Sequence, residues 1–221
     1  MSRKWVILDW NLRGINSQLR WNDIRQNIEE SNCNILCFQE TKRENFDLSY
    51  IRNFAPRRFD QFIHSPSIGS SGGLIIIWNS HLFRGQQISI SRYHITVEFS
   101  CNISGHIWYL TNVYGPNQPD ERSLFINWLL NLDSSPMDNW IIMGDFNLVR
   151  GPENRNRPGG DVNNRIAFNR LISHHDLVEI PLKGRAFTWS NMQNPPLLEK
   201  LDWVFTSAIG HQTFQTLWPE L

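Results

Sequence analysis

The sequence predicts an α/β fold in which mixed β-sheets pack on each other and helices lie outside them. Strand-like segments outnumber helix-like segments along the chain. Some strand candidates are continuous apolar runs, as in strands buried on both faces, whereas others alternate polar and apolar residues, as in strands with one wet face. The 221 residues contain no internal repeat and no low-complexity linker, so we expect a single domain over residues 1–221.

The first part of the chain combines apolar strand candidates with one amphipathic helix. Residues 5–11 (WVILDWN) predict the first strand, and residues 34–38 (NILCF) predict a second, buried strand that leads into the polar pair QE. Between them, apolar residues at helical spacing predict a helix over residues 19–30. Residues 71–78 (SGGLIIIW) predict a strand entered through glycines, and we expect an irregular connection over residues 41–71.

The middle of the chain predicts a hairpin, a long strand and a helix. Residues 86–93 and 94–100 alternate polar and apolar side chains, as a hairpin with one wet face does. Residues 106–117 predict a longer strand that breaks at a Gly-Pro pair. An apolar stripe over residues 124–132, preceded by two acidic residues, predicts an amphipathic helix whose N-terminal end carries negative charge.

The last part of the chain returns to strands. Residues 140–147 predict a buried strand, and a polar, Arg-rich loop then leads to a predicted helix over residues 164–174. Residues 185–190 and 199–205 predict two further short strands. Nothing in this order of elements interrupts the expected α/β pattern.

Composition narrows the classes of function. The formal net charge is zero, so no global field attracts a polyanion, although Arg outnumbers Lys and suits phosphate oxygens. Surface salt bridges explain this bias equally well. The three cysteines form no CxxC pair, which indicates neither a disulfide framework nor a zinc site. The N-terminal apolar run is short for a signal peptide, and no segment approaches the ~18 apolar residues of a membrane span, so we expect an intracellular protein without a membrane partner.

The stretch WIIMGDFNLV, residues 140–149, ends an apolar strand with a polar pair. Side chains alternate faces in an extended chain, so Asp145 and Asn147 would project together from the strand end. The alternative is a turn, because Gly, Asp and Asn tolerate tight backbone geometry. Other parts of the chain have to decide between these two interpretations.

Polar side chains that can handle phosphate or metal recur at the ends of the predicted strands. They are Asn11, Glu40, the segment from Tyr114 to Asn117, Asp145 with Asn147, and Asp202 within the apolar run EKLDWVF. Because a rigid sheet aims the residues at its strand ends, we expect these side chains to share one site.

Each of these residues also has a structural interpretation. Asn11 could cap a turn, and Glu40 could pair with a neighbouring cation, Lys42 or Arg43. Tyr114 could belong to the core, and Asp202 could bond backbone amides. Arg155 and Arg157 in the polar loop could contact a DNA backbone or be solvated. Gly72 and Gly73 lack the Lys-Ser/Thr of a phosphate-binding loop, so we interpret them as a strand entry.

Five motifs in order resemble one family across nearly the whole chain. WNLRG, QETK, NVYGPN, GDFN and LDWVF resemble the motif series of the endonuclease/exonuclease/phosphatase superfamily. The variants SGGLIIIW, GDFNLV and FTWSN most resemble the endonuclease domain of plant non-LTR (LINE-type) retrotransposons. The resemblance implies an α/β, four-layer sandwich of two mixed β-sheets flanked by helices, as in deoxyribonuclease. It also implies metal-dependent phosphodiester hydrolysis, with Mg²⁺ as the cofactor and DNA as the partner.

The resemblance assigns roles to the polar strand ends. Glu40 would be the Mg²⁺ ligand, and Asn11 would orient the metal and phosphate. Asp145 would position or deprotonate the attacking water, and Asn147 would bond a phosphate oxygen. The other three residues have supporting roles in the family: Tyr114 and Asn117 would donate to phosphate oxygens, and Asp202 would orient a catalytic histidine.

The sequence departs from the family pattern at two places. No Ser-Asp-His motif occurs, and the chain stops at TLWPEL, near where that motif should begin, so we expect the last strand to be absent and the domain to be truncated at its C-terminus. His211, the histidine nearest the end, follows Asp202 too closely to replace the missing one. Arg13 stands where several relatives carry an acidic metal ligand.

Three functions follow as hypotheses. The leading one is a nuclear DNA-nicking endonuclease domain of a retrotransposon, with a reverse transcriptase domain in the parent polyprotein. The missing motif motivates an alternative, a non-catalytic remnant that at most binds nucleic acid weakly. An inositol or lipid phosphatase is the third.

Overall fold

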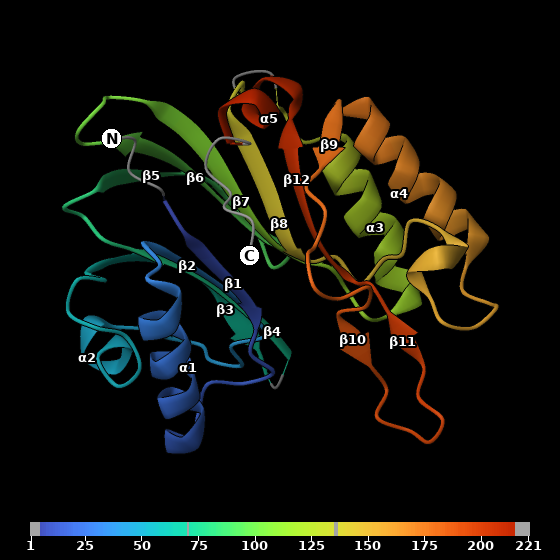
Figure 1. The fold of residues 1–221 in the computed structure, drawn as a ribbon, viewed down its shortest axis with the longest axis horizontal. Coiled ribbons are helices and arrows are strands. Elements are labelled where there is room, and N and C mark those ends of the chain that lie inside the picture. Colours follow the sequence, from blue (N-terminus) through green and yellow to red (C-terminus); the bar gives the residue numbers. More distant parts are fainter. Residues whose placement is uncertain (1–4, 70, 135–136, 215–221) are drawn as a thin grey trace. The chain divides into compact units, whose positions relative to one another are not determined.

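The computed structural model describes residues 5–69, 71–134 and 137–214. These residues fall into two compact units, one comprising residues up to 114 and the other residues from 115 onward. Figure 1 shows strands and helices in both units, which confirms the predicted α/β class. The single domain expected over residues 1–221 stays a prediction. The expected absence of a last strand concerns residues 216–221 and lies outside the described residues.

The first unit contains a mixed four-stranded sheet with helices on one face. The strand order is β1-β2-β4-β3, in which β1 and β2 are parallel and the other pairs antiparallel. The elements are β1 (Ile7–Asn11), α1 (Gln18–Ser31), β2 (Ile35–Gln39), α2 (Leu48–Ile51), β3 (Gln61–Ile68) and β4 (Ser71–Trp78). Ile24 and Ile28 of α1 join Leu36, Phe38 and Ile75 in one buried apolar cluster, which explains why the predicted amphipathic helix packs here.

The other face of this sheet packs on three antiparallel strands of the same unit. They are β5 (Phe83–Ile90), β6 (His94–Cys101) and β7 (Ile107–Tyr114). The antiparallel pairing of β5 with β6 confirms the predicted hairpin, but β5 ends at Ile90. The predicted alternation is wrong, because residues in β5 are mostly exposed and those in β6 mostly buried. Phe83, Phe99 and Trp108 pack their rings together inside the unit. Their burial anchors the hairpin on the four-stranded sheet.

The second unit contains a smaller antiparallel sheet covered by helices. Its strands have the order β8-β12-β9, and a two-stranded ribbon joins β10 to β11. The elements are α3 (Pro119–Leu130), β8 (Trp140–Asp145), the 3₁₀ turn η1 (Pro152–Asn154), α4 (Val162–His174), β9 (Leu177–Glu179), β10 (Trp189–Ser190), β11 (Leu198–Glu199), β12 (Asp202–Ser207) and α5 (Ala208–Phe214). Phe146, Phe168 and Phe205 form mutual ring contacts in its core.

Two segment predictions are wrong. Residues 41–71 are not an irregular connection, because they contain α2 and β3. The strand β3 lies at the sheet edge, where Pro66 is tolerated because it need not donate to a second neighbour. Residues 199–205 are not one strand either, since β11 ends at Glu199 and β12 begins at Asp202.

Several elements were not predicted or were predicted too long. The strand β9 and the helix α5 had no expected counterpart, and only two residues of the 185–190 segment form a strand. All three cysteines are buried with free thiols. Among the described residues, no helix has the length and apolar character needed to cross a membrane.

His94 is a buried histidine whose environment predicts a pH-dependent stability. Its side chain is 2% exposed, and its ring nitrogens lie 2.9 Å from Ser89 Oγ and 2.7 Å from Ser91 Oγ. Burial lowers the pKa of His94 to about 4. Since an unfolded histidine has a pKa of about 6.5, the unfolded chain binds a proton between these values that the folded chain does not.

We therefore expect His94 to lower the free energy of unfolding as the pH falls from about 6.5 to about 4, by up to about 3 kcal/mol, and to have no effect above that window. Urea denaturation of the wild-type protein and of His94→Gln at several pH values measures this contribution. Burial also lowers the pKa values of His64 and His175, so the prediction concerns the difference between the two proteins. If the free energies of unfolding of wild type and His94→Gln change with pH in parallel, the prediction is contradicted.

Candidate active site

The segment after β2 in the first unit is held in an unusual backbone conformation. Glu40 and Lys42 have φ angles of 49° and 53°, in the left-handed region that non-glycine residues rarely adopt. Four backbone hydrogen bonds fix the segment: Gly14 N to Glu40 O, Ile15 N to Thr41 O, Thr41 N to Gly73 O and Lys42 N to Gly72 O. Strain that the surrounding structure maintains is characteristic of functional sites.

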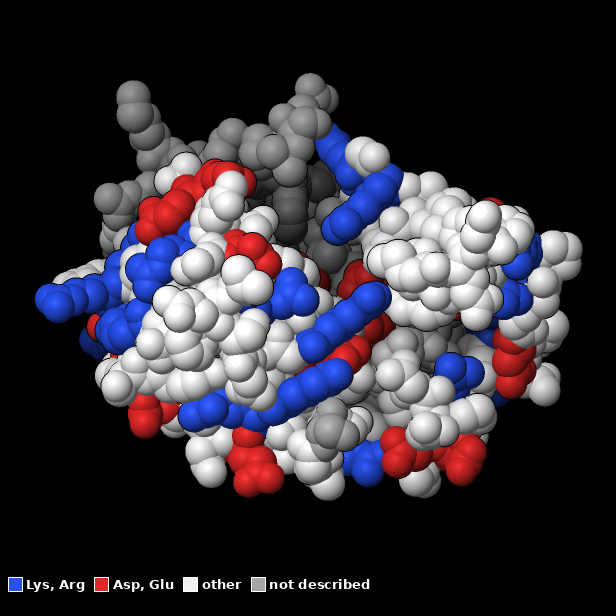
Figure 2. All heavy atoms as spheres, turned by 90° about the horizontal axis from the view of Figure 1, so that it is seen from below, with Lys and Arg blue, Asp and Glu red and all other residues white. Residues whose placement is uncertain are grey.

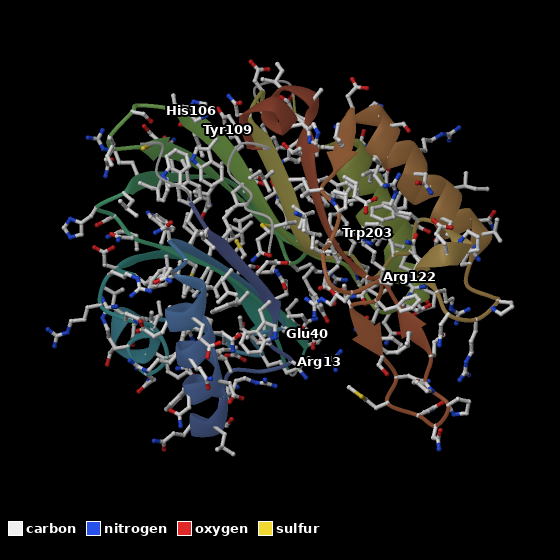
Figure 3. All side chains as sticks on the ribbon, viewed as in Figure 1. Arg13, Glu40, His106, Tyr109, Arg122 and Trp203 are labelled. Atoms are coloured by element: carbon white, nitrogen blue, oxygen red, sulfur yellow. The ribbon has the colours of Figure 1, made fainter. Side chains whose placement is uncertain are left out.

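Asn11 and Glu40 form a hydrogen-bonded pair at the ends of β1 and β2. Asn11 Nδ2 donates to Glu40 Oε1 over 2.9 Å, and Arg13 N donates to Asn11 Oδ1 over 3.1 Å. Both ends of the Asn11 amide are thus oriented. Glu40 Oε2 lies 3.8 Å from Lys42 Nζ, so the predicted alternative of a neighbouring cation is also present. Figure 3 labels Glu40 and Arg13 at the same edge of this unit.

Gly73 explains why glycines stand at the beginning of β4. Its φ is +88°, and a Cβ there would lie 2.3 Å from Thr41 Oγ1. The backbone of β4 therefore approaches the Glu40 segment closely, and a side chain would push the two apart. This confirms the interpretation of Gly72 and Gly73 as a strand entry.

A buried polar chain behind Glu40 was missed by the sequence reasoning. Gln39, which is 0% exposed, donates from Nε2 to Asp9 Oδ1 and to Asn112 Oδ1, each over 2.6 Å. Asn112 in turn donates to the carbonyl oxygens of Phe38 and Ile75. These bonds tie β7 to the four-stranded sheet immediately beside the metal-ligand candidate. The sequence signal was a polar residue directly after one apolar run and a polar residue inside another.

Tyr114 is the last residue of β7 and belongs to the first unit. Its side chain is 8% exposed, and its backbone N–H donates to Tyr93 O over 2.8 Å. It follows Asn112 by two positions, so both side chains lie on the same face of β7. Burial of this kind fits the core interpretation and the site interpretation equally.

Asp145 and Asn147 form a tight turn at the end of β8 in the second unit. The Asp145 side chain is 5% exposed, and its Oδ1 accepts from Asn147 N over 3.0 Å. Asn147 Nδ2 donates to Gly115 O over 2.7 Å. The prediction that both side chains project from an extended strand is wrong, because β8 ends at Asp145 and Asn147 has φ of 52°. The turn alternative describes the backbone, and the two polar groups still lie together.

Gly115 allows the NVYGPN motif to approach this turn. Its N–H donates to Asp145 O over 2.7 Å, and a Cβ at this position would lie 2.0 Å from Phe146 O. Any side chain would therefore collide with backbone. The close approach is what brings the Gly115 carbonyl to the Asn147 amide.

Asp202 lies opposite Asp145 on the neighbouring strand. It is the first residue of β12, and the two residues are Cα partners in the antiparallel pairing of β12 with β8. The expectation that Asp202 lies inside a strand is wrong, because the preceding Lys200 and Leu201 are outside it. Thr188 Oγ1 accepts from Asp202 N over 3.1 Å and fixes this strand start. Two carboxylates thus stand at the same end of one strand pair.

Asn117 lies on the wall of a cavity in the second unit. The cavity has a volume of about 340 Å³, and Asn147, Arg122 and Trp189 also line it. Arg122 donates from Nη2 to Asn117 O over 3.2 Å, which ties the start of α3 to this wall. Figure 3 labels Arg122 near the start of α3. Amide groups from two of the five motifs therefore face one cavity.

The two arginines of the polar loop make structural contacts. Arg155 Nε lies 2.7 Å from Glu199 Oε1, and Arg157 Nη2 donates to Pro196 O over 3.0 Å. Both bonds connect the loop to the ribbon of β10 and β11. On the face shown in Figure 2, basic and acidic side chains are interspersed, so neither sign covers it alone.

The donor set of the first unit suits a hard divalent cation. Glu40 offers a carboxylate whose Oε1 is fixed by Asn11, and such oxygen ligands are those that Mg²⁺ prefers. Among the described residues, no three His, Cys, Asp or Glu side chains form a cluster that could hold a metal. Mg²⁺ is commonly bound through one or two carboxylates with water and phosphate as its other ligands, and Glu40 offers one such carboxylate.

The α/β fold thus carries polar side chains, among them Asn11, Glu40, Asp145 and Asn147, at the ends of its strands. The chain belongs to the Endonuclease/Exonuclease/phosphatase family, whose model matches residues 10–221. Members of this family are typically phosphodiester hydrolases and typically use divalent metals. No match is found among the curated proteins.

Solved structures share the fold at low sequence identity. An AP endonuclease from Leishmania major is 18% identical, with a TM-score of 0.71, over 94% of this chain and 80% of that one. The catalytic domain of APE2 from Xenopus laevis is 18% identical, with a TM-score of 0.68, over 91% and 82%. The endonuclease domain of TRAS1, a telomere-specific non-LTR retrotransposon, is 12% identical, with a TM-score of 0.65, over 92% and 85%. These likenesses confirm the predicted arrangement of two mixed β-sheets flanked by helices.

Proposed function

We propose that this chain is a Mg²⁺-dependent endonuclease domain that nicks one strand of duplex DNA. One observation carries the proposal. Each of two separate carboxylates accepts a hydrogen bond from its own amide N–H, and this bond fixes its orientation. Asn11 Nδ2 holds Glu40 in the first unit, and Asn147 N holds Asp145 in the second. Hydrolysis of a phosphodiester needs one carboxylate for a cation and another for a water proton.

Each residue then has a defined task. Glu40 would hold Mg²⁺, which would neutralise the phosphate charge, and Asn11 keeps the carboxylate in place. Asp145 accepts the proton of the attacking water. Asn147, Asn117 and Tyr114 donate to phosphate oxygens as negative charge develops. Asp202 keeps its proposed task of orienting a histidine.

The fold of a retrotransposon endonuclease domain also supports a more specific origin. In this proposal the chain acts in the nucleus beside a reverse transcriptase domain and opens the DNA strand that the latter extends. A phosphatase of inositol or lipid substrates shares the same chemistry but releases inorganic phosphate.

Plasmid nicking tests the proposal directly. The purified 221-residue chain should convert supercoiled plasmid into open circles with Mg²⁺ and leave it unchanged with EDTA. Linear products alone would contradict single-strand nicking. Release of inorganic phosphate from an inositol phosphate without plasmid conversion would identify a phosphatase. Folded protein that retards DNA in a gel without converting it would favour the non-catalytic remnant.

A further inference from the structure

Lys42 faces the metal-ligand candidate from the same short segment. Its Nζ lies 3.8 Å from Glu40 Oε2, and the two side chains are 38% and 16% exposed. Thr41 between them is 0% exposed and points inward. Because Thr41 points inward, the side chains of Glu40 and Lys42 both project from the outer side of the segment.

The backbone holds Lys42 in this position on both sides. Its N–H donates to Gly72 O over 3.0 Å, and its carbonyl accepts from Asn16 Nδ2 over 3.0 Å. The stem of the side chain passes beside Gly14, where a Cβ would lie 3.7 Å from Lys42 Cδ. The backbone from which the Lys42 side chain starts is therefore fixed in a left-handed conformation, and the stem itself stays free to move.

We propose that Lys42 is the counter-cation of Glu40 in the metal-free protein and that a divalent cation displaces it on binding. This inference rests on the proposed function. Asn11 Nδ2 donates to Oε1, whereas Lys42 Nζ faces Oε2, so a divalent cation that binds through Oε2 meets the ammonium group there. Two cations on one oxygen repel each other, and the ammonium on its flexible stem is the one that moves away.

The inference gives an unusual direction to one substitution. A cationic residue near a catalytic centre is commonly expected to support activity, but removing Lys42 should tighten metal binding because no ion pair has to be broken first. Arg13 provides a matched control. It lies at the same edge of the unit and carries the same charge, yet it forms no ion pair with Glu40 within the part of the chain that the structure describes.

Metal binding can be measured without any enzymatic turnover. Mn²⁺ prefers the same oxygen ligands as Mg²⁺ and has a paramagnetic signal in solution, so titration followed by electron paramagnetic resonance gives its dissociation constant. We expect Lys42→Gln to bind Mn²⁺ about two- to fivefold more tightly than wild type at low salt, which corresponds to the strength of an exposed ion pair. Lys42→Arg should bind like wild type, and Arg13→Gln should change the constant less than Lys42→Gln.

The controls separate this inference from the proposed function. If Lys42→Gln binds no more tightly than Arg13→Gln, or more weakly than wild type, the role of Lys42 is wrong. In that case, loss of binding in Glu40→Gln would still leave the proposed metal ligand intact. If Glu40→Gln binds Mn²⁺ like wild type, the metal site itself is wrong and both ideas fail. Circular dichroism of each variant shows that it is folded before titration.

Discussion

Replacing Asp145 by Asn is expected to lower the rate of DNA nicking by about 10²–10⁴-fold, the range lost when a general base is removed. The amide has the same shape, and its oxygen can still accept from Asn147 N, so the turn after β8 should persist. What disappears is the basic oxygen that takes the proton of water. The loss should therefore appear in the rate and not in the stability.

Initial rates of plasmid conversion with Mg²⁺ measure this effect, and thermal denaturation checks the fold. Glu153→Gln is a suitable control, because it removes one exposed acidic charge from η1 in the same unit. A rate for Asp145→Asn within a factor of three of the control would rule out Asp145 as the base.

Replacing Glu40 by Gln is the second large effect, expected to lower nicking by at least about 100-fold at a Mg²⁺ concentration that saturates wild type. Loss of residues that only orient ligands already costs about 10–100-fold, and a ligand itself should cost more. The Gln side chain can still accept from Asn11 Nδ2, so the pair at the ends of β1 and β2 is kept. A neutral oxygen holds a divalent cation less strongly than a carboxylate does.

The dependence of the rate on Mg²⁺ concentration distinguishes this role from others. The nicking rate of wild type should reach its maximum at a lower Mg²⁺ concentration. The rate of Glu40→Gln should still rise as the Mg²⁺ concentration is increased further. An unchanged Mg²⁺ dependence with a lower maximum would assign Glu40 to a step other than metal binding.

The elements that could be predicted from the sequence are those with a strong local pattern of apolar residues. The apolar runs that became β2, β4 and β8 are buried along nearly their whole length, and α1 shows its apolar stripe. The strand β3 was missed because its residues QFIHSPSI carry no clear period and include a proline. An edge strand is stabilised by its single neighbour, here β4, and that pairing is invisible in the local sequence.

The candidate site was predicted in its residues but not in its geometry. Asn11, Glu40, Asp145 and Asn147 stand at strand ends as expected, yet the left-handed backbone of Asn147 replaces the expected extended one. Bonds such as that from Gln39 to Asn112 join residues 73 positions apart, so no local pattern reveals them. Their residue-level roles stay predictions that the variants above test.

If Glu40 is the proposed metal ligand, its left-handed backbone sets the stability of the fold against the role of the side chain. Glycine adopts this conformation without the cost of roughly 1–2 kcal/mol that a side chain carries there. Laboratory selection for thermal stability alone would therefore favour glycine at residue 40, and the carboxylate would be lost. Under the proposed role of Glu40, keeping glutamate at this position costs stability and retains the proposed metal ligand, so a stabilising design should leave residue 40 unchanged.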